Sequence, residues 1–261
     1  MAKRNNLTQR EKRRLALEMG VEVQQRDSNY QKKTGGGTYN LNKFQLTANQ
    51  QKIEDSIYEF DATIVQGSAG VGKTSVAIRT ALKLLKENNE FKTIIFVKNP
   101  TESGDDAIGF LTGDKDEKLE KHFEVMRGVF LDFMPKGVLE CDEKNGNIRF
   151  DIPNYLQGAT LSDCIVILDE TQNMSPSTLK MLMERLGENS KLIVLGDRAQ
   201  TYAVNSRKDG FTDFVGRITT TEEVDGEQER YSVEPLFNYI ELTSTDNKRS
   251  ALSKRVTELY S

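Results

Sequence analysis

The sequence predicts a three-layer α/β fold, in which helices flank both faces of a central, mostly parallel sheet. The first observation is an apolar, β-branched run at 62–66 that leads through a glycine-rich loop into helical apolar spacing at 75–85. The second is a set of similar short apolar runs that end in polar residues, at 91–97, 164–168 and 191–195. The third is a pair of helical patterns between these runs, at 118–134 and 174–186. Strands that alternate with helices are typical of a parallel sheet.

The glycine-rich loop, Gly67 to Thr74, matches the pattern G-x4-G-K-[ST]. Its glycines would let backbone N–H groups converge on a polyphosphate at the start of a helix, where the helix dipole favours negative charge. Lys73 would neutralise the β- and γ-phosphates, and the Thr74 hydroxyl would hold Mg²⁺. The alternative, an ordinary glycine-rich turn, is disfavoured by the flanking strand and helix. The residues expected to contact nucleotide are Gly67, Ser68, Ala69, Gly70, Val71, Gly72, Lys73, Thr74 and Ser75.

Two adjacent carboxylates, Asp169 and Glu170, follow the apolar run at 164–168. A buried parallel strand that ends in such a pair is typical of a Walker B motif. Asp169 would order Mg²⁺ through water, and Glu170 would polarise the attacking water. Alone, the pair would more often be a solvated acidic turn, but beside a P-loop it favours a nucleotide site. The predicted fold class is therefore a RecA-like P-loop NTPase.

Two glutamines are further candidates. Gln50 precedes the P-loop at a position where several helicase-like ATPases read the adenine edge through an amide. Gln200 ends the polar cluster 196–200, which follows the apolar run at 191–195 and fits a γ-phosphate sensor. The alternatives are a glutamine at an ordinary helix start and a simple turn. His122 lies in the helical pattern at 118–134, and we expect it to be solvated and not to act as a base.

Composition limits the class of protein. The chain has 261 residues, 29% of them charged, which suits one large or two small globular domains. No apolar run approaches the ~20 residues that span a bilayer, so no membrane association is expected. The first residues lack the apolar core of a signal peptide. With only Cys141, Cys164 and His122 as soft ligands, we expect neither a disulfide framework nor a zinc site, and we expect a cytoplasmic location.

Charge is unevenly distributed along the chain. Residues 1–43 carry ten lysines and arginines against four acidic residues, a net charge of +6. The rest of the chain holds 26 basic and 36 acidic residues, so its net charge is −10. We expect 1–43 to be a basic, partly disordered arm and linker, and 44–261 to be the ATPase domain. The arm is either a nucleic-acid contact or a solvated tail.

The remaining segments have weaker patterns. Helices are expected at 52–60 and 211–218, and another is expected to start at Asp246. Asp142 to Asn147 has turn chemistry that predicts a small hairpin within 137–150. A loop or short strand is expected at 155–160, an acidic loop at 219–228, and a strand within 231–242.

The assembled motifs resemble the PhoH family of P-loop ATPases, a phosphate-starvation-inducible group related to superfamily 1 helicase cores, including short stand-alone forms found in phages. The resemblance runs from about Thr47 to Tyr260. Its pairing of Asp-Glu-x-Gln-Asn with Gly-Asp-x-x-Gln is more specific than the P-loop alone. The matching blocks are Asn49-Gln50, 67–74, Asn99-Pro100, 109–114, 158–161, 167–173, 180–185, 196–200 and 246–255.

The resemblance implies ATP at the P-loop, Mg²⁺ at Thr74 and Asp169, hydrolysis assisted by Glu170, Gln200 as sensor and Gln50 as adenine reader. It also implies work on RNA or single-stranded DNA. Two departures weaken that last implication: Asn99 stands where the family usually has arginine, and Thr112 where it usually has proline.

Superfamily 1 helicases place a γ-phosphate arginine on a second core domain, for which we expect no room here. A neighbouring subunit would then supply it in a head-to-tail ring, such as a hexamer. Arg249 matches a family arginine and is the first candidate, with Arg255 second; the alternative is that both form surface ion pairs.

Three functions remain in competition. The first is an ATPase coupled to RNA or single-stranded DNA, which the basic arm supports. The second is a nucleotide-dependent assembly or binding factor with little turnover. The third, a small-molecule kinase, is disfavoured because kinases seldom combine the Asp-Glu and Gly-Asp-x-x-Gln blocks.

Overall fold

The computed structural model describes residues 39–43, 45–87, 90–100, 115–198, 209–224, 227–243, 246–247 and 255. The strands are β1 (Ala62–Gln66), β2 (Thr93–Lys98), β3 (Ile148–Asp151), β4 (Cys164–Asp169), β5 (Lys191–Gly196), β6 (Thr219–Val224), β7 (Glu227–Ser232) and β8 (Phe237–Glu241). The helices are α2 (Ala48–Glu59), α3 (Lys73–Glu87), α4 (Lys115–Phe130), α5 (Lys136–Lys144), α6 (Pro176–Met183) and α7 (Gly210–Ile218). Short 3₁₀ helices are η1 (Leu41–Lys43), η2 (Pro153–Leu156) and η3 (Thr171–Asn173).

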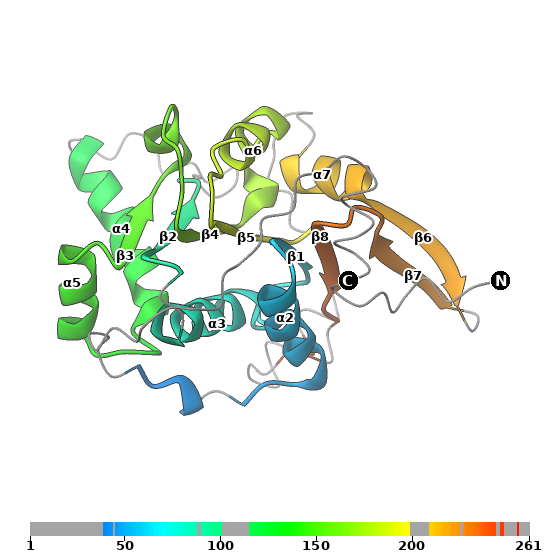
Figure 1. Cartoon of the computed structure of the whole chain (residues 1–261), viewed down its shortest axis with the longest axis horizontal. Coiled ribbons are helices and arrows are strands. Elements are labelled where there is room, and N and C mark those ends of the chain that lie inside the picture. The colour runs from blue at the N-terminus through cyan, green and yellow to red at the C-terminus, as the bar shows by residue number, and fades with distance from the viewer. Residues whose placement is uncertain are drawn as a thin grey trace.

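The central sheet has six strands in the order β3-β2-β4-β5-β1-β8 (Figure 1). Every neighbouring pair in it is parallel, which confirms the predicted parallel sheet. Since parallel strands share one direction, all their carboxyl ends lie along one edge. Strands β6 and β7 form a separate antiparallel pair, which projects from the body of the molecule (Figure 1).

Each strand sends alternate side chains into two cores. In β1, Val65 belongs to the core that helices α2, α3, α4 and α5 cover. Its neighbour Ile64 belongs to the opposite core, which α6, α7 and η2 cover. Both side chains are 0% exposed. The predicted three-layer α/β architecture of a P-loop NTPase is confirmed.

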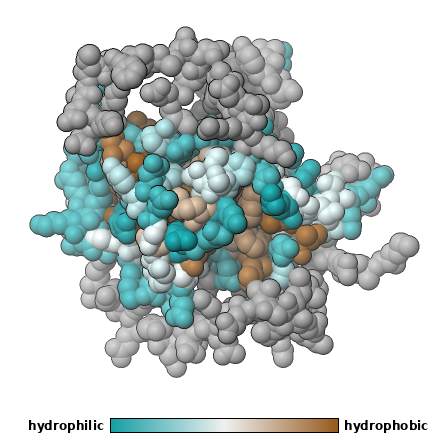
Figure 2. Space-filling view, turned by 90° about the horizontal axis from the view of Figure 1, so that it is seen from above, coloured by the Kyte–Doolittle hydropathy of each residue, from teal (hydrophilic) through white to brown (hydrophobic). Residues whose placement is uncertain are grey.

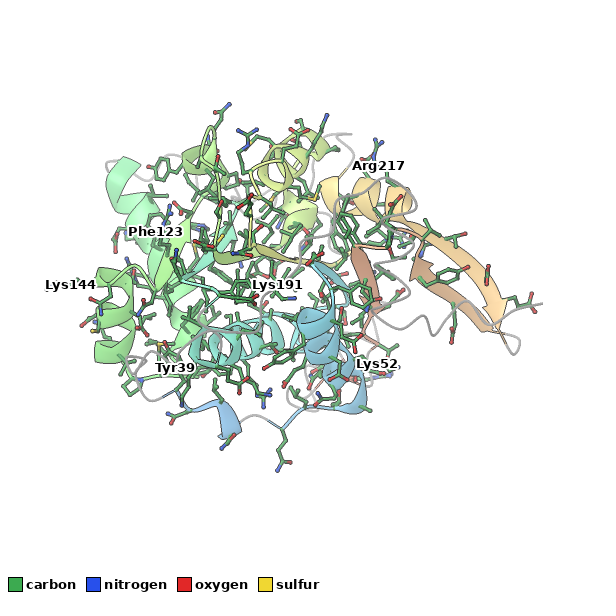
Figure 3. The ribbon with its side chains drawn as sticks, viewed as in Figure 1. Tyr39, Lys52, Phe123, Lys144, Lys191 and Arg217 are labelled. Atoms are coloured by element: carbon green, nitrogen blue, oxygen red, sulfur yellow. The ribbon has the colours of Figure 1, made fainter. Side chains whose placement is uncertain are left out.

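A buried lysine connects two of these layers. Lys191, the first residue of β5, is 1% exposed and lies near the centre of the molecule (Figure 3). Its ammonium donates to the carbonyls of Phe60, at 2.6 Å, and Tyr58, at 3.3 Å, at the end of α2. Helix C-termini leave carbonyls that such a cation satisfies. The contact fixes the chain as it enters β1.

The hairpin predicted within 137–150 is wrong. The segment forms helix α5, capped by Asn145, and then strand β3, which pairs with β2 in parallel. The turn-forming residues at 142–147 do form a turn, but it joins helix α5 to strand β3. Gly146 in this turn has a φ of +74°. Asp142 is buried and accepts hydrogen bonds from the Tyr39 hydroxyl, at 2.9 Å, and from the Asn147 side chain. Tyr39 thus packs onto the core beside α5.

The acidic segment 219–228 is also different from its prediction. It contains β6 and the start of β7, because the β-branched run at 219–221 pairs with 230–232 in antiparallel. The segment 155–160, expected to be a loop or short strand, begins inside the 3₁₀ helix η2. The predicted helices at 52–60, 118–134, 174–186 and 211–218 are present as α2, α4, α6 and α7, with shifted ends.

Large hydrophobic side chains are exposed at four positions of the described residues. Figure 2 shows a mainly hydrophilic face, with hydrophobic atoms in limited areas. The exposed large hydrophobic side chains lie on separate segments: Val125, Leu131, Tyr155 and Val233. Single exposed hydrophobic residues are normal on folded proteins. Among the described residues, no helix has the length and apolar character required to cross a membrane.

Candidate nucleotide site

The P-loop joins the carboxyl end of β1 to the start of α3, as the sequence predicts. Gly70 and Gly72 both have a φ of +87°, a conformation that residues with side chains rarely adopt. A Cβ on Gly67 would lie 2.9 Å from the Val71 side chain and 3.0 Å from that of Leu242. The loop therefore requires glycine at all three positions. A glycine loop at the start of a helix is suited to binding an anion.

The Lys73 side chain folds back over its own loop. Its ammonium donates to the carbonyl oxygens of Gly67, at 2.6 Å, and Ser68, at 3.1 Å. The cation is therefore held within the loop by neutral acceptors. A bound phosphate would offer it charged oxygen acceptors, which make stronger hydrogen bonds.

The two predicted Mg²⁺ ligands lie together. The Thr74 hydroxyl donates to Asp169 Oδ1 at 3.1 Å, so the first turn of α3 faces the end of β4. Asp169 is 4% exposed. Burial raises the pKa of its carboxyl above the ordinary value, while the charge of Lys98 and the hydrogen bond from Thr74 act in the opposite direction.

Lys98 is a residue that the sequence reasoning missed. It ends β2, pairs in register with Asp169, and its ammonium lies 3.5 Å from Asp169 Oδ2. The sequence shows Lys98 at the end of an apolar run, but it does not show that this strand neighbours β4. That neighbour relationship brings a positive charge to the predicted Mg²⁺ position.

These groups fit a Mg²⁺–nucleotide complex. Mg²⁺ prefers oxygen ligands and is commonly held by one or two protein groups together with substrate phosphates. Thr74 and Asp169 supply such oxygens from two elements, beside a loop suited to phosphate. Within the described residues, no cluster of three or more His, Cys, Asp or Glu side chains could hold a metal without a substrate.

Glu170 adopts a conformation that is unusual for its residue type. Its φ of 52° and ψ of 45° lie in the left-handed region, which costs about 1–2 kcal/mol for an L-residue. The next residues form η3, in which the Asn173 N–H donates to the Glu170 carbonyl at 3.0 Å. Strained backbone that the surroundings hold in place is common at functional sites.

Gln172 and Thr171 are further residues that the sequence reasoning passed over. The Gln172 amide donates to Glu170 Oε2 at 2.5 Å and accepts from the Asp197 N–H at 3.1 Å. The Thr171 hydroxyl donates to the carbonyl of Leu195 at 2.8 Å. The sequence signal that could have identified them is the Asp-Glu-x-Gln-Asn block at 169–173. These bonds join the turn after β4 to the end of β5.

Gln50 lies at the P-loop, but its amide forms hydrogen bonds with the backbone of the protein. It is 1% exposed, its amide donates to the Val71 carbonyl at 2.8 Å, and its oxygen accepts from the Thr47 N–H at 3.0 Å. The second bond belongs to the capping box of α2. These two bonds use one of the two amide hydrogens and one of the two oxygen lone pairs of Gln50. Adenine reading by Gln50 therefore stays a prediction.

The end of β2 is tied to neighbouring elements through two polar side chains. Asn99 donates from its side chain to the Asn173 carbonyl at 2.9 Å. His122 of α4, expected to be solvated, is half-buried, and its Nε2 lies 3.1 Å from the Lys98 carbonyl. Because a carbonyl can only accept, Nε2 carries the proton. Burial lowers the pKa of this imidazole, the bond to the Lys98 carbonyl opposes the change, and the Lys98 charge adds to it.

The C-terminal segment returns to the start of α2. Asp246 is buried and accepts hydrogen bonds from the side chains of Thr47, at 2.8 Å, and Asn49, at 3.1 Å. Arg255 is described and exposed. The predicted sensor Gln200, the predicted trans arginine Arg249 and the block 109–114 lie outside the described residues.

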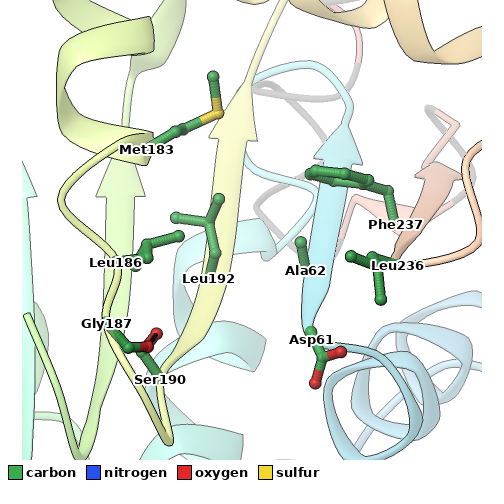
Figure 4. Close-up of a pocket in the computed structure, with 9 residues that line it drawn as sticks. All are labelled: Asp61, Ala62, Met183, Leu186, Gly187, Ser190, Leu192, Leu236 and Phe237. Atoms are coloured by element: carbon green, nitrogen blue, oxygen red, sulfur yellow. Dashed lines mark hydrogen bonds between the residues drawn. The ribbon is translucent and has the colours of Figure 1, made fainter. Parts of the chain in front are cut away.

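A cavity of about 230 Å³ lies at the opposite edge of the sheet from the P-loop. Figure 4 shows it between the starts of β1 and β5, the segment after α6, and β8. Its lining is mainly apolar, with Asp61 and Ser190 as polar members. The cavity is therefore separate from the predicted nucleotide site.

Comparisons with known proteins agree with the sequence motifs. A family model described as "PhoH-like protein" matches residues 44–261. A PhoH-like protein of Synechocystis is 34% identical over 215 residues, covering 82% of this chain and 61% of the relative. A PhoH-like protein of Bacillus subtilis is 31% identical, covering 82% of this chain and 62% of the relative. The chain thus spans about three-fifths of the length of these relatives.

Solved structures of other proteins match more weakly. The large terminase of a thermophilic bacteriophage covers 84% of this chain and 51% of its own, at 15% identity and a TM-score of 0.45. The Pif1 helicase of Candida albicans covers 77% of this chain and 40% of its own, at 14% identity and a TM-score of 0.38.

Proposed function

The chain belongs to the PhoH-like family, and we propose that it is a Mg²⁺-dependent ATPase of P-loop type. The observation that carries the proposal is the contact between Thr74 and Asp169 beside the P-loop, with Glu170 as the next residue. An anion-binding loop, a pair of hard oxygen ligands and a carboxylate at one edge are the parts that nucleotide hydrolysis needs.

Each residue has a proposed task. Lys73 would exchange the Gly67 and Ser68 carbonyls for phosphate oxygens, and Thr74 and Asp169 would hold Mg²⁺. Bound Mg²⁺ neutralises the charge that develops on the phosphate oxygens. Glu170 would accept a proton from water as the water oxygen bonds to the γ-phosphorus. The bond from that phosphorus to the β–γ bridging oxygen breaks, and the proton leaves with inorganic phosphate.

Phosphate release tests this proposal. Purified protein should release phosphate from ATP with Mg²⁺, and the release should stop when EDTA removes the metal. A folded protein that binds no nucleotide and releases no phosphate would contradict the proposal. Adenosine and guanosine triphosphates should be compared, because adenine reading by Gln50 is still a prediction.

We further propose that hydrolysis is coupled to RNA or single-stranded DNA. The net charge of +6 on residues 1–43 supports this coupling, since phosphate contacts by lysine and arginine dominate nucleic-acid affinity. Turnover should rise with one of these polynucleotides and lose the stimulation at higher salt. A version without residues 1–38 is the matched control. Unchanged turnover with every polynucleotide would remove the coupling and leave the ATPase proposal intact.

Assembly into a homo-oligomeric ring is part of the same proposal, with Arg249 of one subunit completing the site of the next. An arginine at the transferring phosphate can contribute ~10³–10⁵ in rate. Mixing Arg249→Ala with Glu170→Gln protein would then restore some activity, because each subunit supplies the group that its neighbour lacks. An Arg249→Ala oligomer with normal turnover would remove Arg249 from the proposal.

The competing proposal is a nucleotide-dependent assembly factor with little turnover, also in the cytoplasm. Light scattering with ATP and with a slowly hydrolysed analogue separates the two functions. An equal size change with both nucleotides, at negligible phosphate release, would favour the assembly factor.

A further inference from the structure

A single buried amide joins the Walker B glutamate to the neighbouring strand. Gln172 is 2% exposed, and both ends of its amide are used. Its Nε2 donates to Glu170 Oε2 at 2.5 Å, and its Oε1 accepts from the Asp197 N–H at 3.1 Å. Asp197 is the first residue after β5. The carboxylate of Glu170 is thus connected to the segment that follows β5 through one side chain.

The turn that carries Gln172 is held on both sides. Toward β5, the Thr171 hydroxyl donates to the Leu195 carbonyl at 2.8 Å, and Thr171 is 0% exposed. Toward β2, the Asn99 side chain donates to the Asn173 carbonyl at 2.9 Å. These contacts fix the backbone of η3. They do not touch the Glu170 carboxylate, so its direction depends on Gln172.

The orientation of Glu170 needs such support. Its left-handed backbone, with a φ of 52°, is strained and sends the side chain away from the direction that a continuing strand would give. A carboxylate has several rotamers of similar energy, and a hydrogen bond to one oxygen selects among them. Catalytic groups must be held close to productive geometry by neighbours that are themselves fixed.

We propose that Gln172 is a positioning residue, which orients the Glu170 carboxylate and transmits to it the position of the segment beginning at Asp197. The proposal rests on the proposed ATPase function, in which Glu170 accepts the proton of the attacking water. A displacement of Asp197 on nucleotide binding would move the Gln172 amide and with it the carboxylate. Hydrolysis would then respond to the state of the segment after β5.

The test compares Gln172→Leu with Thr63→Val, at a buried hydroxyl in β1 that contacts the Ser56 hydroxyl at 2.8 Å. Leucine removes both amide bonds and keeps most of the volume, whereas valine removes one buried hydroxyl and leaves the turn after β4 unchanged. In Gln172→Leu, kcat should fall by about 10–100-fold, as for other residues that orient a reacting group. KM should change by less than about threefold. Thr63→Val should keep kcat within about threefold of the wild type.

A double-variant comparison shows whether Gln172 acts through Glu170. In a Glu170→Gln background, adding Gln172→Leu should lower the remaining single-turnover rate by no more than about twofold, because coupled residues give non-additive effects. If Gln172→Leu lowers the single-turnover rate in the Glu170→Gln background as much as it lowers kcat in the wild type, the proposal is contradicted. If Gln172→Leu fails to fold, Gln172→Met replaces it, since its unbranched thioether keeps most of the volume and has no hydrogen to donate to Glu170.

A second readout does not depend on activity. Hydrogen exchange of the Asp197 amide should be faster in Gln172→Leu than in wild type or Thr63→Val, because only the leucine variant loses the acceptor of this amide. Unchanged exchange would contradict the link to β5. If wild type releases no phosphate, or Glu170→Gln stays active, the ATPase proposal fails. If Glu170→Gln is inactive while Gln172→Leu keeps wild-type kcat, the role of Gln172 alone fails.

Discussion

Thr74 Oγ1 lies 3.1 Å from Asp169 Oδ1, although 95 residues separate them in the chain. The contact follows from the sheet, in which β5 lies between β1 and β4 and all three strands run in the same direction. The loops that follow β1 and β4 therefore meet at one edge, where ligands of open α/β sheets bind. This pair of oxygens is the centre of the proposed Mg²⁺ site.

Removing the Thr74 hydroxyl should weaken Mg²⁺ dependence specifically. Thr74→Val should lower kcat at least about tenfold and raise the Mg²⁺ concentration needed for half-maximal phosphate release, because one oxygen ligand is lost. Thr80→Val is the matched control, since the Thr80 hydroxyl donates to the Val76 carbonyl at 2.9 Å within the same helix. Equal Mg²⁺ titrations for both variants would contradict the assignment of Thr74.

Glu54 should be important for stability. It is 5% exposed and forms ion pairs with Arg79 and with Lys83, the latter at 2.6 Å. Glu54→Gln should lower the free energy of unfolding by about 2–4 kcal/mol, because it leaves two partly buried cations without their carboxylate. Glu140→Gln breaks the exposed pair with Lys136 and should cost about 0–1 kcal/mol. Urea titrations measure the free energy of unfolding of both variants. Equal losses would show that burial does not determine how much these ion pairs stabilise the protein.

A side chain at Gly196 should displace Phe211. A Cβ there would lie 2.4 Å from the ring of Phe211, which is 0% exposed at the start of α7. Gly196→Ala should therefore lower the free energy of unfolding by about 1–3 kcal/mol through overpacking. Gly128→Ala in α4 meets nothing within 4 Å and should stabilise by about 0.5–1 kcal/mol. Thermal unfolding compares the stability of the two variants. A Gly196→Ala protein as stable as wild type would contradict the prediction and show that α7 moves aside without loss of stability.

The stability of the protein should fall as His122 is protonated. Burial lowers the pKa of His122 in the folded state, so the unfolded chain binds this proton more readily. The neutral form of His122 therefore contributes fully to the free energy of unfolding above its ordinary pKa of about 6.5. This contribution is lost as the pH falls through the lowered pKa of the folded protein. Urea titrations across this pH range should show a smaller fall in the free energy of unfolding for His122→Gln than for wild type. The glutamine amide does not take up the proton, but it can still donate to the Lys98 carbonyl. An identical loss in both proteins would exclude His122 as its source.

The sequence predicted the parts of the fold that depend on local pattern. The P-loop needs strand, glycines and helix in one continuous stretch, and Asp169 and Glu170 directly follow an apolar strand. The pairing of Thr74 with Asp169 could be expected because both follow parallel strands. Local turn chemistry was less informative. The signal around Gly146 is shared by hairpins and by helix-to-strand turns, and only the pairing of β3 with β2 distinguishes them.

Contacts between distant segments could not be predicted in the same way. Lys98 reaches Asp169 because β2 neighbours β4, and strand order is decided by packing of the whole sheet. Gln172 reaches Asp197 because β5 is the other neighbour of β4. Gln50 was predicted near the nucleotide, but its bond to the Val71 carbonyl depends on how α2 packs on the loop.

The central claim is that this site hydrolyses ATP through Glu170 rather than only binding it. The most direct measurement is nucleotide binding and phosphate release on wild type, Glu170→Gln and Lys73→Ala under one set of conditions. We expect Glu170→Gln to bind ATP with Mg²⁺ as wild type does and to release phosphate at least about 100-fold more slowly. Lys73→Ala should lose affinity for ATP. Wild-type phosphate release by Glu170→Gln, or unchanged binding and turnover by Lys73→Ala, would contradict the claim.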